Sequence, residues 1–144
     1  MAQRTTDDQP EALPPALGSM TLMVAAVIVH DRATHRVVLL QRGRNAKFGQ
    51  GMWDLPVGKS EPGEPITATA VRELYEETGL TVKAEALKVA HIIHGALAHR
   101  EPLKHAQVRW VDVDAVPEAF VSSTASALQH YLSGGVGISL GGWS

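Results

Sequence analysis

The sequence predicts a single domain of the α+β class, and three observations support this prediction. Apolar, β-branched runs that are typical of strands occur on both sides of the chain's midpoint. A run of good helix formers lies between Pro65 and Gly79, two residues that favour the start and the end of a helix. The 144 residues are enough for one domain with a buried core.

The first part of the chain predicts a leader and a pair of strands. Residues 1–19 contain three prolines and a glycine without an apolar period, so we expect a disordered leader. Residues 21–29 and 36–42 are apolar and rich in β-branched residues. The turn sequence HDRATH between them favours a hairpin. A polar, glycine-rich loop is expected at residues 43–52.

The second part predicts two helices and two more strands. The first helix is expected at 65–78, with strands within 82–93 and at 107–113. The second helix is expected at 122–132, where hydroxyl side chains are available to cap it. We therefore place the domain at residues 20–133 and expect a loose, glycine-rich tail at 134–144.

Composition excludes several classes of function. The chain has no cysteine, so disulfides, thiolate metal sites and cysteine nucleophiles are impossible. A formal net charge of -2 provides no broad basic surface for nucleic acid. The apolar run at residues 22–29 is too short to cross a bilayer and has no basic segment before it. We expect a cytoplasmic protein without a membrane partner.

The tripeptide GKS at residues 58–60 resembles the end of a nucleotide-binding P-loop, but its surroundings argue against that motif. A P-loop requires a glycine where Trp53 stands. It also requires a helix that begins at about Lys59, and Pro62 and Pro65 oppose one. A P-loop nucleotidase is therefore only a weak alternative.

The first expected helix carries three carboxylates on one face. At roughly 100° per residue, Glu73, Glu76 and Glu77 fall within an arc of about 100°. Thr67, Val71, Leu74 and Thr78 fall on another side, which is expected to pack on a sheet. Like charges at this spacing repel one another, and the helix dipole disfavours acids in the last turn. A bound divalent cation would remove both penalties, and carboxylate oxygens are the ligands that Mg²⁺ prefers.

The segment at residues 58–80 resembles the Nudix box without a mismatch. Its fixed positions are Gly58, Glu64, Arg72-Glu73-Leu74, Glu76-Glu77 and Gly79-Leu80. The preceding stretch WDLPVGKSEPGE also resembles the approach to that box. The resemblance extends weakly over residues 20–133 and implies an α/β/α sandwich around a mixed sheet, in which the box forms a loop, a helix and a loop.

The resemblance implies hydrolysis of a nucleoside diphosphate linked to another moiety, with Mg²⁺ as the cofactor and Mn²⁺ as an alternative. Metal ions neutralise the charge of a diphosphate, acidify a water and align it for in-line attack. Glu76 and Glu77 would be metal ligands, and Glu73 a ligand or the water-activating base. Arg72 would orient the glutamates through a charge-assisted hydrogen bond.

Further site residues follow from the same resemblance. Gly58 would contribute a tight turn and a backbone carbonyl to the metal, and Glu64 would contribute an acid, directly or through water. A turn alone and a salt bridge are the respective alternatives. The candidate substrate contacts are Lys59 for phosphate, Trp53 for base stacking, and Arg42. A solvated lysine and a packed tryptophan are the competing interpretations.

The histidines do not predict a metal site. His91 and His94 lie three residues apart, so in a strand they point to opposite faces and cannot easily share one ion. Trp110 alternates with valines and is expected in the core or on the sheet surface.

The interval after the box departs from the family pattern because it is short, polar and interrupted by a proline. The composition of the stretch HGALAHREPLKHA disfavours a central strand, and its only acid, Glu101, is the default candidate for an additional catalytic acid. This shortening motivates a second hypothesis, a Nudix-fold module that binds a nucleotide or a partner without turnover. An unpaired sheet edge would favour pairing with a second copy, so we also keep a homodimer as a hypothesis.

Overall fold

The computed structural model describes residues 23–46, 48–95 and 105–141, and the leader at residues 1–19 and Glu101 lie outside these ranges. The strands are β1 (Val24–Ala26), β2 (His30–Asp31), β3 (Arg36–Arg42), β4 (Trp53–Asp54), β5 (Val57–Lys59), β6 (His91–Gly95), β7 (His105–Asp112) and β8 (Gly137–Gly141). The helices are α1 (Ile66–Thr78) and α2 (Ser122–Leu132), with short 3₁₀ turns at Ala84–Ala86 and Val113–Ala115.

Strand β3 is the centre of the largest sheet. It pairs antiparallel with β2, β4 and β7, and its register with β7 runs from Arg36 opposite Asp112 to Arg42 opposite His105. The four residues 37–40 are all buried, as expected for a strand covered on both faces. Two smaller sheets complete the fold, β1 antiparallel with β5 and β6 parallel with β8.

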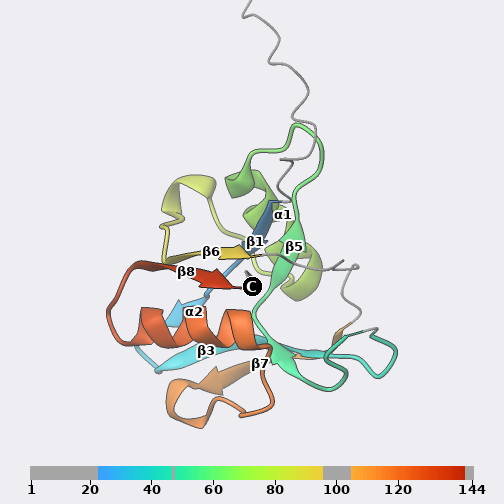
Figure 1. Ribbon diagram of the computed structural model, residues 1–144, viewed down its shortest axis with the longest axis vertical. Helices are drawn as coiled ribbons and strands as arrows, with labels where there is room; N and C mark the ends of the chain where they lie inside the picture. Colours follow the sequence, from blue (N-terminus) through green and yellow to red (C-terminus); the bar gives the residue numbers. More distant parts are fainter. Residues whose placement is uncertain (1–22, 47, 96–104, 142–144) are drawn as a thin grey trace, which may run out of the picture.

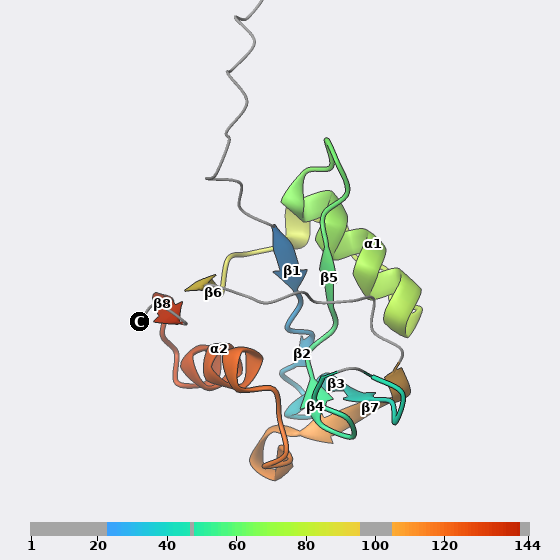
Figure 2. The same cartoon turned by 45° about the vertical axis from the view of Figure 1, so that its right-hand side comes forward.

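The two helices lie on different sides of the strands (Figures 1 and 2). Helix α2 covers one hydrophobic core, built from Val37 and Leu39 of β3 together with Leu55, Phe120 and Leu128. Helix α1 covers a second core, in which Ala70 and Leu74 meet Ala25 and Val27 from the start of the chain. This mixed arrangement of strands between two helices agrees with the α+β fold class that the sequence predicts.

Both helices that the sequence patterns predict are present in the structure. Helix α2 has the predicted bounds. A hairpin is present, but it joins β3 to β2 in the stretch that was expected to be the turn, and β1, the strand within residues 21–29, pairs with β5 instead. Gly79 ends α1 with a left-handed φ of 75°, and its N–H donates to the Tyr75 carbonyl at 2.8 Å. Glycine adopts this conformation without the steric cost that a side chain would bring.

Several boundaries differ from the prediction. The apolar run at residues 21–29 contains only the short strand β1, after which the Val27 N–H donates to the Pro56 carbonyl at 2.8 Å, and β2 begins beyond the run at His30. The strand expected within residues 82–93 begins only at His91, after the 3₁₀ turn at 84–86. The tail expected to be loose contains β8, which pairs with β6.

Two expectations about the helices are wrong in detail. Val121 is the N-cap of α2, and because its side chain is apolar no hydroxyl caps the helix; the Thr124 hydroxyl donates to Asp54. On α1 the face that packs on the sheet consists of Thr69, Ala70 and Leu74, whereas Thr67 is exposed. Within the described ranges, no helix is long and apolar enough to cross a membrane.

Candidate active site

The candidate site is organised around Arg72, on the face of α1 that borders β5. Its guanidinium donates from Nε and Nη2 to the two carboxylate oxygens of Glu64, both at 2.9 Å. Nη1 donates to Glu73 Oε1 at 2.7 Å and to Glu76 Oε2 at 3.3 Å, and Nη2 also reaches the Lys59 carbonyl at 3.0 Å. These bonds raise the pKa of Arg72, chiefly through Glu64, so one cation ties three acids to the strand.

Glu64 is fixed by several donors at once. Besides the two bonds from Arg72, it accepts a 2.6 Å hydrogen bond from the Thr69 hydroxyl and a 3.2 Å bond from the Glu61 N–H. The Arg72 guanidinium, helped by Thr69, lowers the pKa of Glu64 to about 2. The salt bridge that we considered as the alternative role of Glu64 is therefore present.

Glu73 occupies a space that only a glycine leaves open. A Cβ atom placed on Gly58 would lie 1.9 Å from Glu73 Cδ and 2.3 Å from its Oε2. Any larger residue at position 58 would push this carboxylate away from β5. A glycine is therefore required at position 58 for more than the predicted turn, because it lets the Glu73 carboxylate approach the backbone closely.

Glu77 has the opposite environment from Glu64. It lies against β5, where its Oε2 accepts a hydrogen bond from the Val57 N–H at 3.1 Å. Burial, together with the charges of Glu73, Asp54 and Glu76, raises the pKa of Glu77 to about 8, against the lowering effect of that hydrogen bond. The site therefore concentrates negative charge at one partly buried position.

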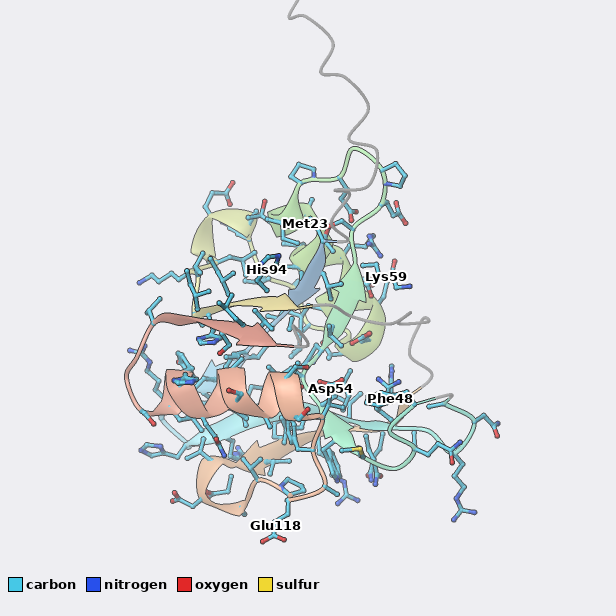
Figure 3. All side chains as sticks on the ribbon, viewed as in Figure 1. Met23, Phe48, Asp54, Lys59, His94 and Glu118 are labelled. Atoms are coloured by element: carbon cyan, nitrogen blue, oxygen red, sulfur yellow. The ribbon has the colours of Figure 1, made fainter. Side chains whose placement is uncertain are left out.

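Asp54 is a member of this charged group to which sequence reasoning assigned no role. Its side chain is fully buried at the end of β4, where Oδ1 accepts from the Thr124 hydroxyl at 2.6 Å and from the Leu55 N–H at 2.8 Å. Figure 3 shows it in the interior beside α2. An aspartate between Trp53 and Leu55 in an apolar stretch was the available signal, because a buried charge requires specific partners.

The structure places the three candidate substrate contacts differently. Lys59 lies on β5, and Figure 3 shows it on the outside of the molecule. Trp53 packs against the core beneath α2, which agrees with the competing interpretation as a packed residue. Arg42 is only 8% exposed; its Nε donates to the Phe48 carbonyl at 2.7 Å and its Nη1 lies 3.7 Å from Asp54 Oδ2. This burial argues against a phosphate contact for Arg42, which anchors the loop at 43–52 instead.

The carboxylates fit a hard divalent cation in their chemistry. Glu73, Glu76 and Glu77 share one side of α1, and the negative charges of Glu73 and Glu76 disfavour ionisation of Glu77. The absence of a side chain at Gly58 leaves room for the Glu73 carboxylate next to the backbone of β5. In the part of the chain that the structure describes, no three His, Asp or Glu side chains are already gathered around one metal position. Glu73 and Glu76 point to Arg72, so a cation would compete with that arginine for them.

The histidines do not belong to this site. The His91 ring stacks on His130 at 4.8 Å, and its Nε2 forms a 2.6 Å hydrogen bond with the Ser139 hydroxyl. His94 is three residues further along β6 and is exposed. The two histidines therefore have different surroundings, His91 against α2 and His94 exposed.

Comparison with known proteins supports the interpretation of the box. A family model described as the NUDIX domain matches residues 20–131. The mouse protein Nucleoside diphosphate-linked moiety X motif 6 is 43% identical over 74 residues, which make up 51% of this chain and 21% of that protein. The zebrafish Oxidized purine nucleoside triphosphate hydrolase is 34% identical over 99 residues, 57% of this chain and 62% of that one. The chain thus spans about a fifth of the mouse relative.

A solved structure shows the same fold. The MutT protein from Methanosarcina mazei Go1 superposes with a TM-score of 0.63 at 20% identity, covering 78% of this chain and 94% of that one. This likeness confirms the predicted Nudix-type fold, and the family model covers most of the chain, including the box that holds the site. The chain belongs to the Nudix family.

Proposed function

We propose that the chain is a metal-dependent hydrolase that cleaves the diphosphate bond of a nucleoside diphosphate linked to another moiety. The observation that carries the proposal is the environment of Glu77, which is held in a partly buried place close to the charges of Glu73, Asp54 and Glu76. Such an arrangement opposes ionisation of Glu77 unless a cation joins the group. Membership of the Nudix family supports the same conclusion.

Glu73, Glu76 and Glu77, with the Gly58 carbonyl, would hold Mg²⁺ or Mn²⁺. The bound cation would supply charge neutralisation on the diphosphate and acidification of a water. Arg72 orients Glu73 through their 2.7 Å bond, and Glu64 fixes Arg72 from the other side. Glu64 thus supports the site through Arg72 rather than as a ligand, because its oxygens already accept four hydrogen bonds.

The reaction consumes one water. Its oxygen forms a bond to one phosphorus while the bond from that phosphorus to the bridging oxygen breaks, and the leaving phosphate keeps the electron pair. If Glu73 is not itself a ligand, it would accept the proton of the attacking water, and its position beside Gly58 of β5 supports this alternative role.

The test is a substrate panel with Mg²⁺, containing oxidised purine nucleoside triphosphates, dinucleotides and nucleoside diphosphates linked to sugars. We expect turnover of at least one compound, loss of at least about 100-fold of it in Glu77→Gln, and full activity in the matched control Glu118→Gln, an exposed acid. Magnesium affinity, measured by calorimetry, should fall in Glu77→Gln and not in the control.

The alternative, a binding module without turnover, gives a different pattern in the same experiment. Its motivation remains the short interval after the box, and the present contacts of Glu73 and Glu76 with Arg72 are compatible with it. Nucleotide binding without product release across the whole panel, with or without metal, would favour the module and reject hydrolysis.

A further inference from the structure

Phe48 is an exposed aromatic side chain next to the candidate active site. Its ring is 60% exposed, and the Cζ atom of Arg42 lies 5.6 Å from the ring centroid. The same guanidinium lies 3.7 Å from the Asp54 carboxylate, whose charge contributes to the raised pKa of Glu77. Figure 3 shows Phe48 and Asp54 close together. One side chain, Arg42, therefore connects the Phe48 ring to the charged group of the site.

The loop that carries Phe48 is held by hydrogen bonds before any ligand binds. The Phe48 carbonyl accepts from Arg42 Nε at 2.7 Å, and the Gly51 N–H donates to the Arg42 carbonyl at 3.0 Å. The Met52 N–H donates to the Gly49 carbonyl at 2.9 Å, in a turn where Gly49 has a left-handed φ of 62°. A ligand that contacts the ring would therefore lose little free energy to ordering this loop.

The surroundings of Phe48 distinguish it from an ordinary exposed side chain. Single exposed apolar residues are normal on protein surfaces, so exposure alone indicates no ligand. Phe48 has a cation against its ring, and the rest of the ring is open to solvent. A ring held in this way offers a face to another flat π system. Trp53, the base-stacking candidate from the sequence, packs instead against the core beneath α2.

The neighbouring carboxylates indicate which π system would bind. A diphosphate held through metal at the glutamates of α1 carries its nucleoside on one of the two phosphates, within reach of the adjacent loop. Every nucleobase has a π face that can stack on an aromatic side chain. Phenylalanine has no polar atom in its side chain, so it would hold the base without reading the hydrogen-bonding groups on the base's edge.

We propose that Phe48 is the stacking platform for the nucleobase of the substrate. The inference rests on the proposed function, because the glutamates must hold the diphosphate next to the loop. It adds a binding residue outside the box and a source of affinity that depends on the presence of a base.

The decisive experiment measures equilibrium binding and not turnover. Calorimetry with Mg²⁺ compares the α,β-methylene analogue of ADP with methylenediphosphonate, which has the same bridged diphosphate and no nucleoside. We expect wild type to bind the nucleotide analogue at least about 10-fold more tightly, because stacking of a base on an aromatic ring contributes on this scale. Phe48→Ala should remove most of this difference and change the affinity for methylenediphosphonate less than about 2-fold. Phe48→Tyr retains the ring and should keep the difference.

Two matched variants separate stacking from apolar bulk and from general effects. Phe48→Leu keeps an apolar side chain without the ring and should lose the base-dependent affinity. Trp110→Leu removes another exposed aromatic ring, on β7 opposite Val38, and should keep that affinity. A Phe48→Ala variant that weakens both ligands equally would show a structural role and overturn the inference. Wild-type affinity that does not depend on the base, or a loss in the Trp110 variant alone, would also overturn it.

The same variants distinguish failure of this inference from failure of the proposed function. Base-dependent affinity that requires Phe48, in a chain that turns over no compound of the panel, would support the stacking platform and reject hydrolysis. Turnover of a panel compound with an unchanged KM in Phe48→Ala would leave hydrolysis standing and overturn the inference.

Discussion

The acids of the candidate site fall into two groups with opposite electrostatics, although most of them come from one helix. On the arginine side, Glu64, Glu73 and Glu76 all accept hydrogen bonds from Arg72, and the pKa of Glu64 is lowered to about 2. On the sheet side, Glu77 lies near buried Asp54, and its pKa is raised to about 8. The helix and the motif are shared, so the difference comes from what each carboxylate faces.

The two groups of acids are suited to different roles, one to positioning side chains and the other to binding a metal ion. A bidentate arginine bond fixes a carboxylate and keeps it charged, which is suited to a framework. A carboxylate that is desolvated among other acids gains most from a cation, which is suited to a ligand. On the arginine side, Arg72 would therefore fix the positions of the Glu73 and Glu76 carboxylates. On the sheet side, Glu77 would gain the most free energy when a metal ion binds. The changes below act on one side at a time.

The largest effect is expected from Gly58→Ala, which displaces the Glu73 carboxylate from β5. The new Cβ would overlap Glu73 Cδ at 1.9 Å, and the flexible side chain must move. We expect activity to fall by about 100-fold, since a displacement of about 1 Å at a catalytic group has that cost. The stability change should stay below about 1 kcal/mol, because the atoms that move are at the end of a side chain.

Steady-state kinetics and thermal unfolding check the two parts of this expectation. Gly137→Ala is the control, because its Cβ would meet the His91 ring at an ordinary 3.6 Å. Full activity in Gly58→Ala would show that the position of Glu73 at β5 is not required. Equal activity losses in both variants would point to a general effect of adding a methyl group.

The next largest effect is expected from Arg72→Lys, which keeps the positive charge but removes the planar guanidinium that binds both oxygens of Glu64. A lysine cannot hold both Glu64 oxygens and also reach Glu73, so the framework loses its orientation. We expect kcat to fall by about 10–100-fold, as for partners that orient a metal ligand. Arg36→Lys, in the hairpin, should behave like wild type. A change confined to KM would indicate a substrate contact for Arg72 rather than a framework role.

Local patterns in the sequence identified Arg72 and the acids of the helix, Glu77 included, whereas tertiary contacts bring Asp54 to the sheet side of the site. The helix, its end at Gly79 and the set Arg72, Glu73, Glu76 and Glu77 depend on residues close together in the chain. Asp54 acquires its role through Thr124, which lies 70 positions further on. No spacing rule connects two such residues, so the sequence analysis did not place Asp54 in the charged group.

The same distinction explains the errors in the fold. The run at residues 21–29 has the composition of one strand, but its middle donates to Pro56, a contact that composition does not encode. Strand β8 has a glycine-rich sequence typical of a loose tail, and it becomes a strand by pairing with β6, more than 40 residues earlier. Arg42 has the charge of a phosphate contact, but its burial makes it a loop anchor.

The pH dependence of stability should separate the two sides in the metal-free protein. Glu77 has a folded pKa of about 8 against an ordinary 4.5, so the folded state binds more protons between these values. Its contribution to stability is therefore present below pH 4.5 and falls as pH rises to 8. We expect wild type to lose about 1–3 kcal/mol relative to Glu77→Gln over this range, allowing for screening.

Glu64 should show the opposite sign. Its lowered pKa means that its contribution is present above pH 4.5 and is lost as pH falls toward 2. Denaturant unfolding of wild type, Glu77→Gln and Glu64→Gln at several pH values tests both slopes. Saturating Mg²⁺ should flatten the alkaline slope, because the bound ion keeps Glu77 ionised. If the free energy of unfolding changed with pH in the same way for both variants, Glu64 and Glu77 would not differ in electrostatic role.

The smallest effect is expected from Thr124→Val, which acts on the sheet side without touching the box. The substitution keeps the shape of the side chain but removes the 2.6 Å hydrogen bond to Asp54, whose carboxylate is fully buried. We expect a loss of about 1–2 kcal/mol in the free energy of unfolding, because a buried charged acceptor loses a donor. Thr124→Ser retains the hydroxyl and should recover most of that loss.

Activity should change less than about 3-fold, since Thr124 lies beyond Asp54 from the glutamates and this free-energy cost falls on the folded state as a whole. A larger activity loss in Thr124→Val than in Arg72→Lys would reverse the proposed roles, because buried Asp54 would then hold the geometry of the site.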